Sequence, residues 1–117
     1  MSRDTKPISW VKAARKDFEK FPEGAQLEIR FALTLAAEGS KADTAKPMKG
    51  LGPGVFEVAL GHRGDAFRTV YAVQFADAVW VVHAFQKKSR HGIRTPRKEV
   101  ELIRDRLKRL REMLKDG

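Results

Sequence analysis

Basic residues and a histidine follow directly after the most apolar run of the sequence. The run AVWVV leads into the stretch AFQKKSRHGIRTP, at residues 84–96. That stretch contains Lys87, Lys88 and His91, and Arg68 lies earlier in the chain among small and apolar residues. Such a set suits the cleavage of an RNA phosphodiester by the neighbouring 2′-hydroxyl. This reaction needs a base, an acid and positive charge at the phosphate, and no metal is obligatory for it.

Histidine is the side chain whose ordinary pKa best suits proton transfer at neutral pH. His91 belongs to the basic stretch and is the first candidate. His83, within VVHAF, is the second, although a histidine in such a strand is more often a hydrogen-bonded core residue than a catalyst. The residues alone leave the base and the acid unassigned.

An arginine among apolar strand residues needs an anion or an acid as its partner, because burial of an unpaired charge is costly. For Arg68 two partners are open. One is a bound anion such as a phosphate, and the other is a salt bridge to Glu57 on the neighbouring strand.

Several other chemistries find no support in the sequence. There is no cysteine, which excludes disulfides, thiolate zinc sites and cysteine nucleophiles. The three histidines are scattered, and the glycine-rich KGLGPG lacks the Lys-Ser/Thr ending of a phosphate-binding loop, so no metal and no cofactor is expected. The N-terminus is charged and no apolar stretch could span a bilayer, so we expect a soluble, cytoplasmic protein.

Positive charge is concentrated in the last third of the chain. The formal net charge is +9, and residues 86–111 contain eleven Lys or Arg against three acids. This distribution favours a surface that binds a polyanion. A solvated helix surface kept soluble by its charge is the alternative.

The first half of the chain predicts a strand and two helices. KPISWVK offers a short alternating strand, and apolar spacing predicts a helix over residues 12–20. A second helix begins at Pro22 and Glu23 and ends at Gly39, with Leu27, Phe31 and Leu35 on one side. Residues 39–54, rich in Gly and Pro, are expected to be a surface connection without a regular element.

The second half predicts a three-stranded antiparallel meander and a final helix. The strands are expected at residues 55–60, 66–75 and 78–85, and Thr95-Pro96 begins the helix. Val100, Ile103, Leu107, Leu110 and Leu114 then form a narrow apolar seam, which packs on the sheet or on a partner. We therefore expect one α+β domain, residues 1–117, in the order β-α-α-β-β-β-α, with two helices on one sheet face and the opposite face partly open.

The strings KPMKGLGPGVFEV, FRTVYAV and VWVVHAFQKKSRHGIRTPRKEVELI resemble the phage-derived, HigB-like branch of the RelE/ParE toxin superfamily. The resemblance runs from Ile8 to about Leu110, and its most specific piece is HAFQKKS followed by a helix opened by Thr-Pro. It implies a compact antiparallel sheet of about four strands with a helical hairpin and a C-terminal helix. It also implies a type II toxin that cleaves mRNA on the ribosome without metal. Its partners would be the ribosome, mRNA and an antitoxin, often a helix-turn-helix protein, with which it forms a hetero-oligomer.

The resemblance assigns roles to individual residues. Arg68 matches a strand arginine that contacts the scissile phosphate, Lys87 and Lys88 match a catalytic basic position, and Lys49 matches a lysine that helps to hold the RNA. Many members have a tyrosine or an acid-histidine cluster near the C-terminus, and this chain has neither after Pro96. The expected RNA-binding residues are Lys49, Arg63, Phe85, Arg90, Arg94, Arg97 and Lys98.

Two rival functions stay open. One is a ParE-like toxin that inhibits a protein target such as a topoisomerase, which would not need these cations on one open face. The other is an inactive, phage-derived nucleic-acid-binding protein, for which the basic surface is sufficient.

Overall fold

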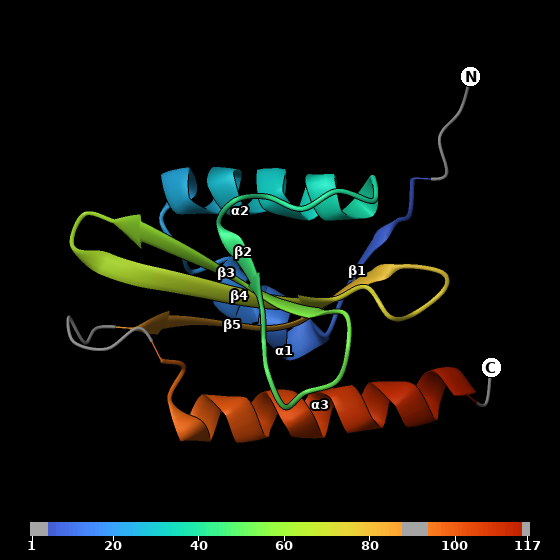
Figure 1. The fold of residues 1–117 in the computed structure, drawn as a ribbon. Helices are drawn as coiled ribbons and strands as arrows, with labels where there is room; N and C mark the ends of the chain where they lie inside the picture. The colour runs from blue at the N-terminus through green and yellow to red at the C-terminus, as the bar shows by residue number, and fades with distance from the viewer. Residues whose placement is uncertain (1–4, 88–93, 116–117) are drawn as a thin grey trace.

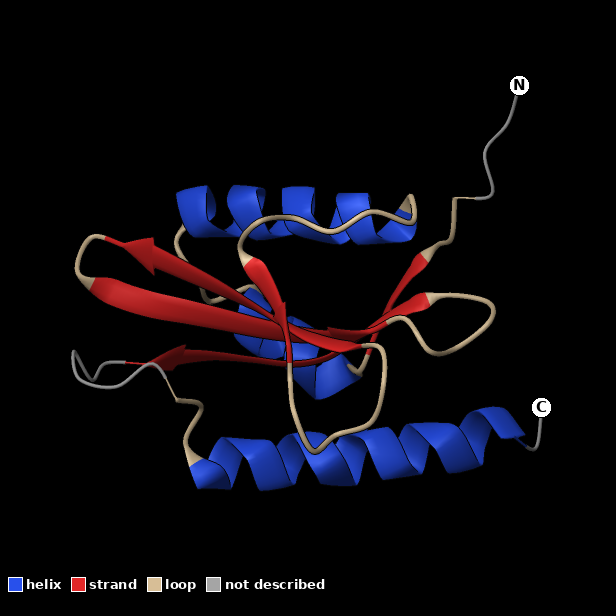
Figure 2. Cartoon of the chain, viewed as in Figure 1, coloured by secondary structure: helices blue, strands red, loops and turns tan. Residues whose placement is uncertain are grey.

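The computed structural model describes residues 5–87 and 94–115. A mixed sheet lies between a pair of helices and a single long helix (Figures 1 and 2). The elements are, in chain order, β1 (Ile8–Trp10), α1 (Lys12–Phe18), α2 (Glu23–Ala37), β2 (Ala45–Pro47), β3 (Val55–His62), β4 (Asp65–Ala72), β5 (Val79–Lys87) and α3 (Arg97–Lys115). The predicted α+β class and the three-stranded meander are confirmed.

The sheet has five strands in the order β1-β5-β4-β3-β2. β1 pairs in parallel with β5, and the other pairs are antiparallel. The prediction of about four antiparallel strands was therefore wrong in strand number and in the direction of the first pair. β2 lies in the segment that was expected to hold no regular element. Three residues that include Pro47 are too few to give a strand signal, and pairing with β3 makes the strand.

α1 and α2 pack on one face of the sheet, around Phe18, Ile29 and Leu33. The predicted stripe of α2 faces outward, because Leu27 and Phe31 are 65% and 64% exposed. The helix instead packs on the sheet through a side rich in alanine, whose short side chains allow a close approach. That side consists of Ala25, Ile29, Ala32, Leu33, Ala36 and Ala37.

α3 covers the opposite face of the sheet. Ile103, Leu107 and Leu110 are buried there against Val70 and Val82. The predicted apolar seam thus packs inside the chain, on the sheet. The expectation of a partly open second face was wrong, because burying this seam requires the helix to lie across that face.

None of the helices in the described part of the chain is long and apolar enough to cross a membrane.

Candidate active site between the sheet and α3

A β-bulge in β5 sets which residues face α3. His83 is opposite Val70 and Val81 is opposite Tyr71, so Val82 has no partner of its own in β4. The extra residue changes the alternation of side chains along the strand. Val82 packs with the α3 cluster, and His83 contacts α3 as well, so two consecutive residues point to the same face.

His83 is held by two charged side chains of α3. Its Nε2 lies 2.6 Å from Oε1 of Glu99, and its Nδ1 lies 3.0 Å from Nη1 of Arg106. A guanidinium can only donate, so Nδ1 accepts and Nε2–H donates to the carboxylate. Burial lowers the pKa of His83, and the hydrogen bond to Glu99 partly offsets this effect. His83 is therefore neutral at pH 7, with both ring nitrogens engaged.

Arg68 makes a buried ion pair with Glu57. Its Nη1 lies 3.0 Å from Oε1 of Glu57, and the two side chains are 8% and 13% exposed. The Thr95 hydroxyl donates to the other carboxylate oxygen at 2.7 Å. The salt bridge that the sequence offered as one of two partners for Arg68 is thus present, and Thr95 links it to the segment that precedes α3.

Lys87 and Phe85 complete the cluster at the end of β5. In the ladder, Phe85 is opposite Arg68 and Lys87 is opposite Ala66, so both share the face of Arg68. The Lys87 ammonium is nearly buried and donates to the Arg94 carbonyl at 2.6 Å. The ring of Phe85 stacks on His83, with centroids 5.2 Å apart.

Four predicted residues are thus brought together on one sheet face: Arg68, His83, Phe85 and Lys87. They carry a guanidinium, an imidazole and an ammonium next to two carboxylates, Glu57 and Glu99. Such a set can bind a phosphate and move protons. Because Glu57 already neutralises the arginine, a phosphate would have to compete with this carboxylate.

A family model for the phage-derived protein Gp49-like family matches residues 16–108. The chain belongs to this family. One chain of a solved structure, the toxin-antitoxin complex RelBE2 from Mycobacterium tuberculosis, has a similar fold, with a TM-score of 0.51 at 16% sequence identity. The match covers 75% of this chain and 98% of that one. No curated protein sequence is significantly similar to this chain. The predicted membership of a phage-derived family and the predicted RelE-like fold are confirmed, whereas the HigB assignment stays a prediction.

The other predicted residues of this Gp49-like chain lie around the cluster or apart from it. Arg94, Arg97 and Lys98 are exposed at the start of α3, next to the cluster. Arg63 is exposed in the β3–β4 turn with φ 52°, at the same end of the sheet as Lys87. Lys49 is exposed in the β2–β3 loop, whose Gly50 carbonyl is 3.5 Å from Arg104 of α3, so it lies away from Lys87. The predicted Lys88, Arg90 and His91 fall outside the described residues.

Sequence reasoning gave no site role to Glu99, Arg106 or Thr95. Thr95 was expected only to begin the helix, and Glu99 and Arg106 were counted only among the charges of residues 86–111. A signal was available, because Glu99 and Arg106 are seven residues apart and therefore lie on the same side of a helix as the apolar seam. Charged residues on a buried helix side need partners on the surface that they pack against. Among the described residues, no group of His, Asp and Glu is arranged to hold a metal ion.

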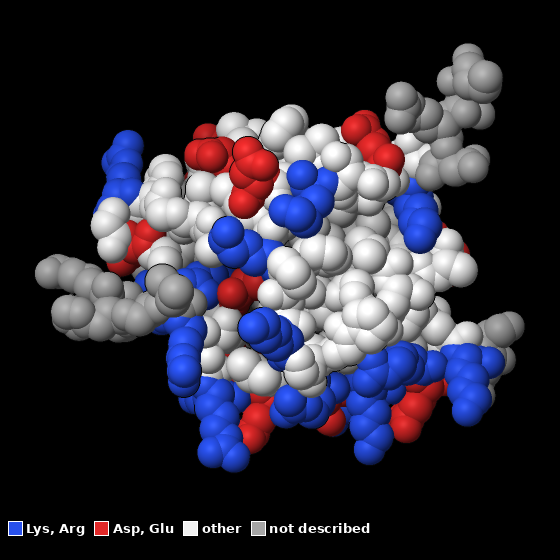
Figure 3. All heavy atoms as spheres, viewed as in Figure 1, with Lys and Arg blue, Asp and Glu red and all other residues white. Residues whose placement is uncertain are grey.

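The outer surface of α3 is strongly basic. Figure 3 shows Lys and Arg side chains gathered along this helix, with fewer acids between them. The helix contains eight Lys or Arg against four acids. The basic surface begins beside the cluster, at Arg97 and Lys98, and continues along the whole helix.

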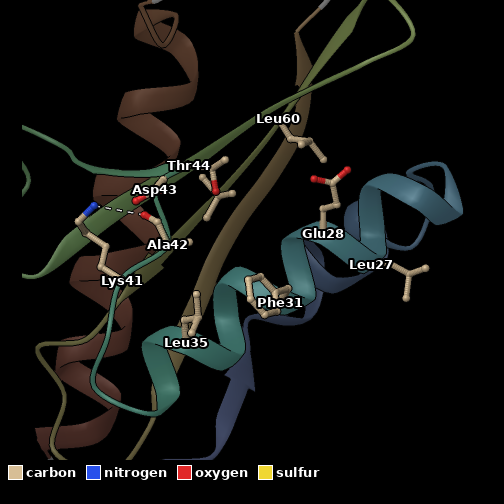
Figure 4. A pocket seen from close by; sticks show the side chains of 10 residues that line it. Leu27, Glu28, Phe31, Leu35, Lys41, Ala42, Asp43, Thr44 and Leu60 are labelled. Atoms are coloured by element: carbon tan, nitrogen blue, oxygen red, sulfur yellow. Dashed lines mark hydrogen bonds between the residues drawn. The ribbon is translucent and has the colours of Figure 1, made fainter.

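The opposite side of the molecule has an apolar groove beside α2 (Figure 4). Its volume is about 480 Å³, and Leu27, Phe31 and Leu35 of α2 line one wall. Leu60 of β3 and the segment from Lys41 to Thr44 line the other wall. Glu28 and Asp43 place acidic groups at the groove, and the Lys41 ammonium is bound to the carbonyls of Ala42 and Ala45. The groove is thus apolar, with two carboxylates and one ammonium at its rim.

Proposed function

We propose that this protein is the toxin of a type II toxin-antitoxin pair and that it cleaves mRNA on the ribosome without a metal. The observation that carries the proposal is the gathering of Arg68, His83 and Lys87 on one sheet face, beside the basic start of α3. The RelE-like fold and the phage-derived family are consistent with it. Such a toxin would act in the cytoplasm, where translation takes place.

In this reaction the two cations would neutralise the phosphate. Arg68 would exchange Glu57 for the scissile phosphate, because both are anions that accept from the guanidinium fork. Lys87 would move from the Arg94 carbonyl to the developing charge of the phosphorane. The cluster is closed by an ion pair and hydrogen bonds in the free protein, so substrate binding has to open it. A ribosome that holds the mRNA in place would supply the necessary binding energy.

His83 and Glu99 are the candidates for proton transfer within the described residues, and His91 is a further candidate from the sequence. For His83 to act as a base, Arg106 must leave Nδ1, because that nitrogen carries the free electron pair. Glu99 is 26% exposed in its side chain and is hydrogen-bonded to the imidazole, so it can also accept a proton from the 2′-hydroxyl. Separate Glu99→Gln, His83→Gln and His91→Gln variants would identify the groups on which cleavage depends.

The proposal is tested by brief expression of the protein followed by mapping of new 5′ ends on cellular mRNA. We expect codon-positioned cleavage with the native chain and its loss in Arg68→Ala and Lys87→Ala. Arg15→Ala, an exposed cation on α1, is the matched control and should cleave like the native protein. Growth arrest without cleavage would reject the nuclease and favour a protein target.

The antitoxin is the second part of the proposal. The groove beside α2 is the docking surface that we propose for it, because Leu27 and Phe31 are exposed and two carboxylates lie at the rim against one ammonium. A segment with apolar anchors and flanking Lys or Arg would be complementary. Copurification of the protein with the product of a neighbouring reading frame, often a helix-turn-helix protein, is the test. Loss of this complex in Leu27→Glu would support the assignment of the surface.

One observation favours a rival function. Arg68 and His83 already have carboxylate partners inside the chain, which is what a purely structural ion pair and a purely structural hydrogen bond would look like. In that case the protein would be a ParE-like toxin that inhibits a protein such as a topoisomerase, or an inactive nucleic-acid-binding protein. Unaffected growth on expression would favour the inactive protein, since a toxin of either kind arrests cells.

A further inference from the structure

We propose that a pocket between α3 and the start of α1 binds an unstacked base of single-stranded RNA. The inference rests on the proposed function, because that function makes RNA the ligand of the basic α3 surface. The pocket has a volume of about 590 Å³. It is separate from the cluster around Arg68, and none of the residues assigned a role from the sequence lines it.

The walls of the pocket are apolar and aromatic. Trp80 of β5 and Trp10 of β1 line it together with Leu102, Leu110 and Met113 of α3. Leu102 and Met113 are 38% and 56% exposed, although both lie beside an otherwise buried helix side. Flat indole rings and a thioether are surfaces on which a nucleobase stacks.

Trp80, which lines the pocket, also carries an indole N–H. The Trp80 Nε1 is buried and has no hydrogen-bond partner among the described residues. A buried N–H without an acceptor costs free energy, so a ligand that moves the indole and brings an acceptor to this nitrogen would recover that cost. The carbonyl oxygens and ring nitrogens of nucleobases are such acceptors.

The charges at the pocket favour a ligand that carries a phosphate. Lys12, Arg106 and Arg109 line it against one carboxylate, Asp105, which is 3.3 Å from the Arg109 guanidinium. The rest of α3 has the same excess of cations. An apolar base joined to an anionic backbone matches this combination, and the continuous basic surface favours a polyanion over an isolated acidic peptide.

Arg106 connects the pocket to the cluster. Its guanidinium lines the pocket, and its Nη1 donates to the Val82 carbonyl and lies 3.0 Å from His83 Nδ1. A phosphate at the pocket would compete for this guanidinium. RNA bound there would thus weaken the contact that keeps His83 Nδ1 occupied, and a base in the pocket would prepare the cluster for the scissile phosphate.

The test uses the fluorescence of the two tryptophans, both of which line the pocket. The probe is a short 2′-O-methyl oligoadenylate, which cannot be cleaved by attack of a 2′-hydroxyl. We expect it to quench the fluorescence in the native protein and in Trp10→Phe, where Trp80 is the only reporter. The matched ligand is an abasic strand with the same number of phosphates, and we expect it to give no quenching. Equal quenching by both strands would overturn the proposal, because phosphate contacts alone would then explain binding.

Variants separate the pocket from the rest of the surface. Met113→Asp and Leu102→Asp should weaken binding by about tenfold or more, since they place a charge where a base would stack. Trp80→Phe keeps an aromatic wall but removes the N–H and should weaken binding severalfold, read out by the anisotropy of a labelled oligoadenylate. Thr34→Asp, at an exposed position on α2, is the matched control and should bind like the native protein. Native affinity in Met113→Asp would overturn the proposal.

Binding to the uncleavable strand does not require activity, so its failure and the failure of the nuclease proposal are distinguishable. An acidic, leucine-containing peptide that quenches the fluorescence and displaces the oligoadenylate would reject the RNA ligand in favour of a protein partner. Cleavage of mRNA with native rates in Met113→Asp would leave the nuclease intact and reject the coupling through Arg106.

Discussion

Arg68 and Glu57 face each other diagonally across two strands rather than as direct neighbours. In the ladder Arg68 is opposite Ala59 and Glu57 is opposite Val70, yet the guanidinium Nη1 reaches Oε1 of Glu57 at 3.0 Å. The small Ala59 leaves room for the arginine to reach along the sheet. The hydroxyl of Thr95 donates to Glu57 and so connects the pair to the segment that leads into α3.

Removing one partner of this pair should destabilise the protein. In Arg68→Met the Glu57 carboxylate stays largely buried without its cation, and we expect the free energy of unfolding to fall by about 3 kcal/mol. Urea unfolding measures the change. In the double variant Arg68→Met/Glu57→Leu most of the loss should be recovered, because no buried charge remains. If the double variant loses as much unfolding free energy as Arg68→Met and Glu57→Leu lose together, the pair has no role in stability.

Acidification should destabilise the protein through His83. Burial lowers the pKa of His83 in the folded chain, so the unfolded chain takes up a proton first as the pH falls below about 6.5. The stability that depends on neutral His83 is therefore present above this pH and is lost below it, down to the folded pKa. Glu99, Arg106 and Asp17 are the charged groups that act on the ring. Thermal unfolding between about pH 7 and about pH 5 should show a smaller decrease of Tm in His83→Gln than in the native protein. Equal slopes would exclude His83 as the source.

Alkali should ionise Tyr71 only late. Burial raises its pKa from 10.0 to about 12, and it is the single tyrosine of the chain. The folded protein holds this proton more tightly than the unfolded one, so stability is lost as the pH rises above about 10. Phenolate absorbance should appear about two pH units later in the native protein than in the denatured one. Coincident titration curves would show that the phenol is accessible to solvent.

Polar substitution on the outer side of α2 should leave the fold intact. Leu27→Ser and Phe31→Ser change side chains that are 65% and 64% exposed, so the free energy of unfolding should change by about 0.5 kcal/mol or less. Ile29→Ser is the matched control. Ile29 is two residues from each of these positions and lies on the buried side of the helix, so this change should be strongly destabilising. Chemical unfolding of the three variants tests the orientation of the helix, and a large loss in Phe31→Ser would contradict it.

The elements with long periodic patterns could be predicted from the sequence. The apolar seam from Val100 to Leu114 predicted the length of α3, and the β-branched and aromatic runs predicted β3 and β5. The short β1 and β2 are stabilised by pairing with longer strands, so the partner rather than the local sequence decides their strand number and direction. For α2, two sides of the helix had apolar residues. The side with alanines packs on the sheet because its short side chains allow a closer approach. The spacing of apolar residues does not distinguish the two sides.

The candidate site was predictable in its cations and not in its carboxylates. Arg68 and Lys87 stand out as charges at the centre and the end of apolar strands, and the structure puts them on one face. The bulge that turns His83 to this face depends on the pairing of β5 with β4 and leaves no mark in the sequence. Glu99 and Arg106 could not be told from solvated helix charges until the face of the sheet beneath them was known.

The bulge interrupts the alternation of side chains in β5. Deletion and insertion of a residue at the bulge should therefore have different effects. Val79 and Val81 precede it and point to the α1–α2 layer, as Ala84 does after it, whereas Phe85 follows the phase of His83. Deleting Val82 would restore a regular ladder and leave every later side chain on its present face. Adding a residue at the same place would bring the number of extra residues to two, which also restores the alternation but moves every later side chain two positions along β4, so that His83 would lie opposite Arg68 instead of Val70. A shortened strand should therefore keep these side chains opposite their present partners, while a lengthened one should displace them along the sheet.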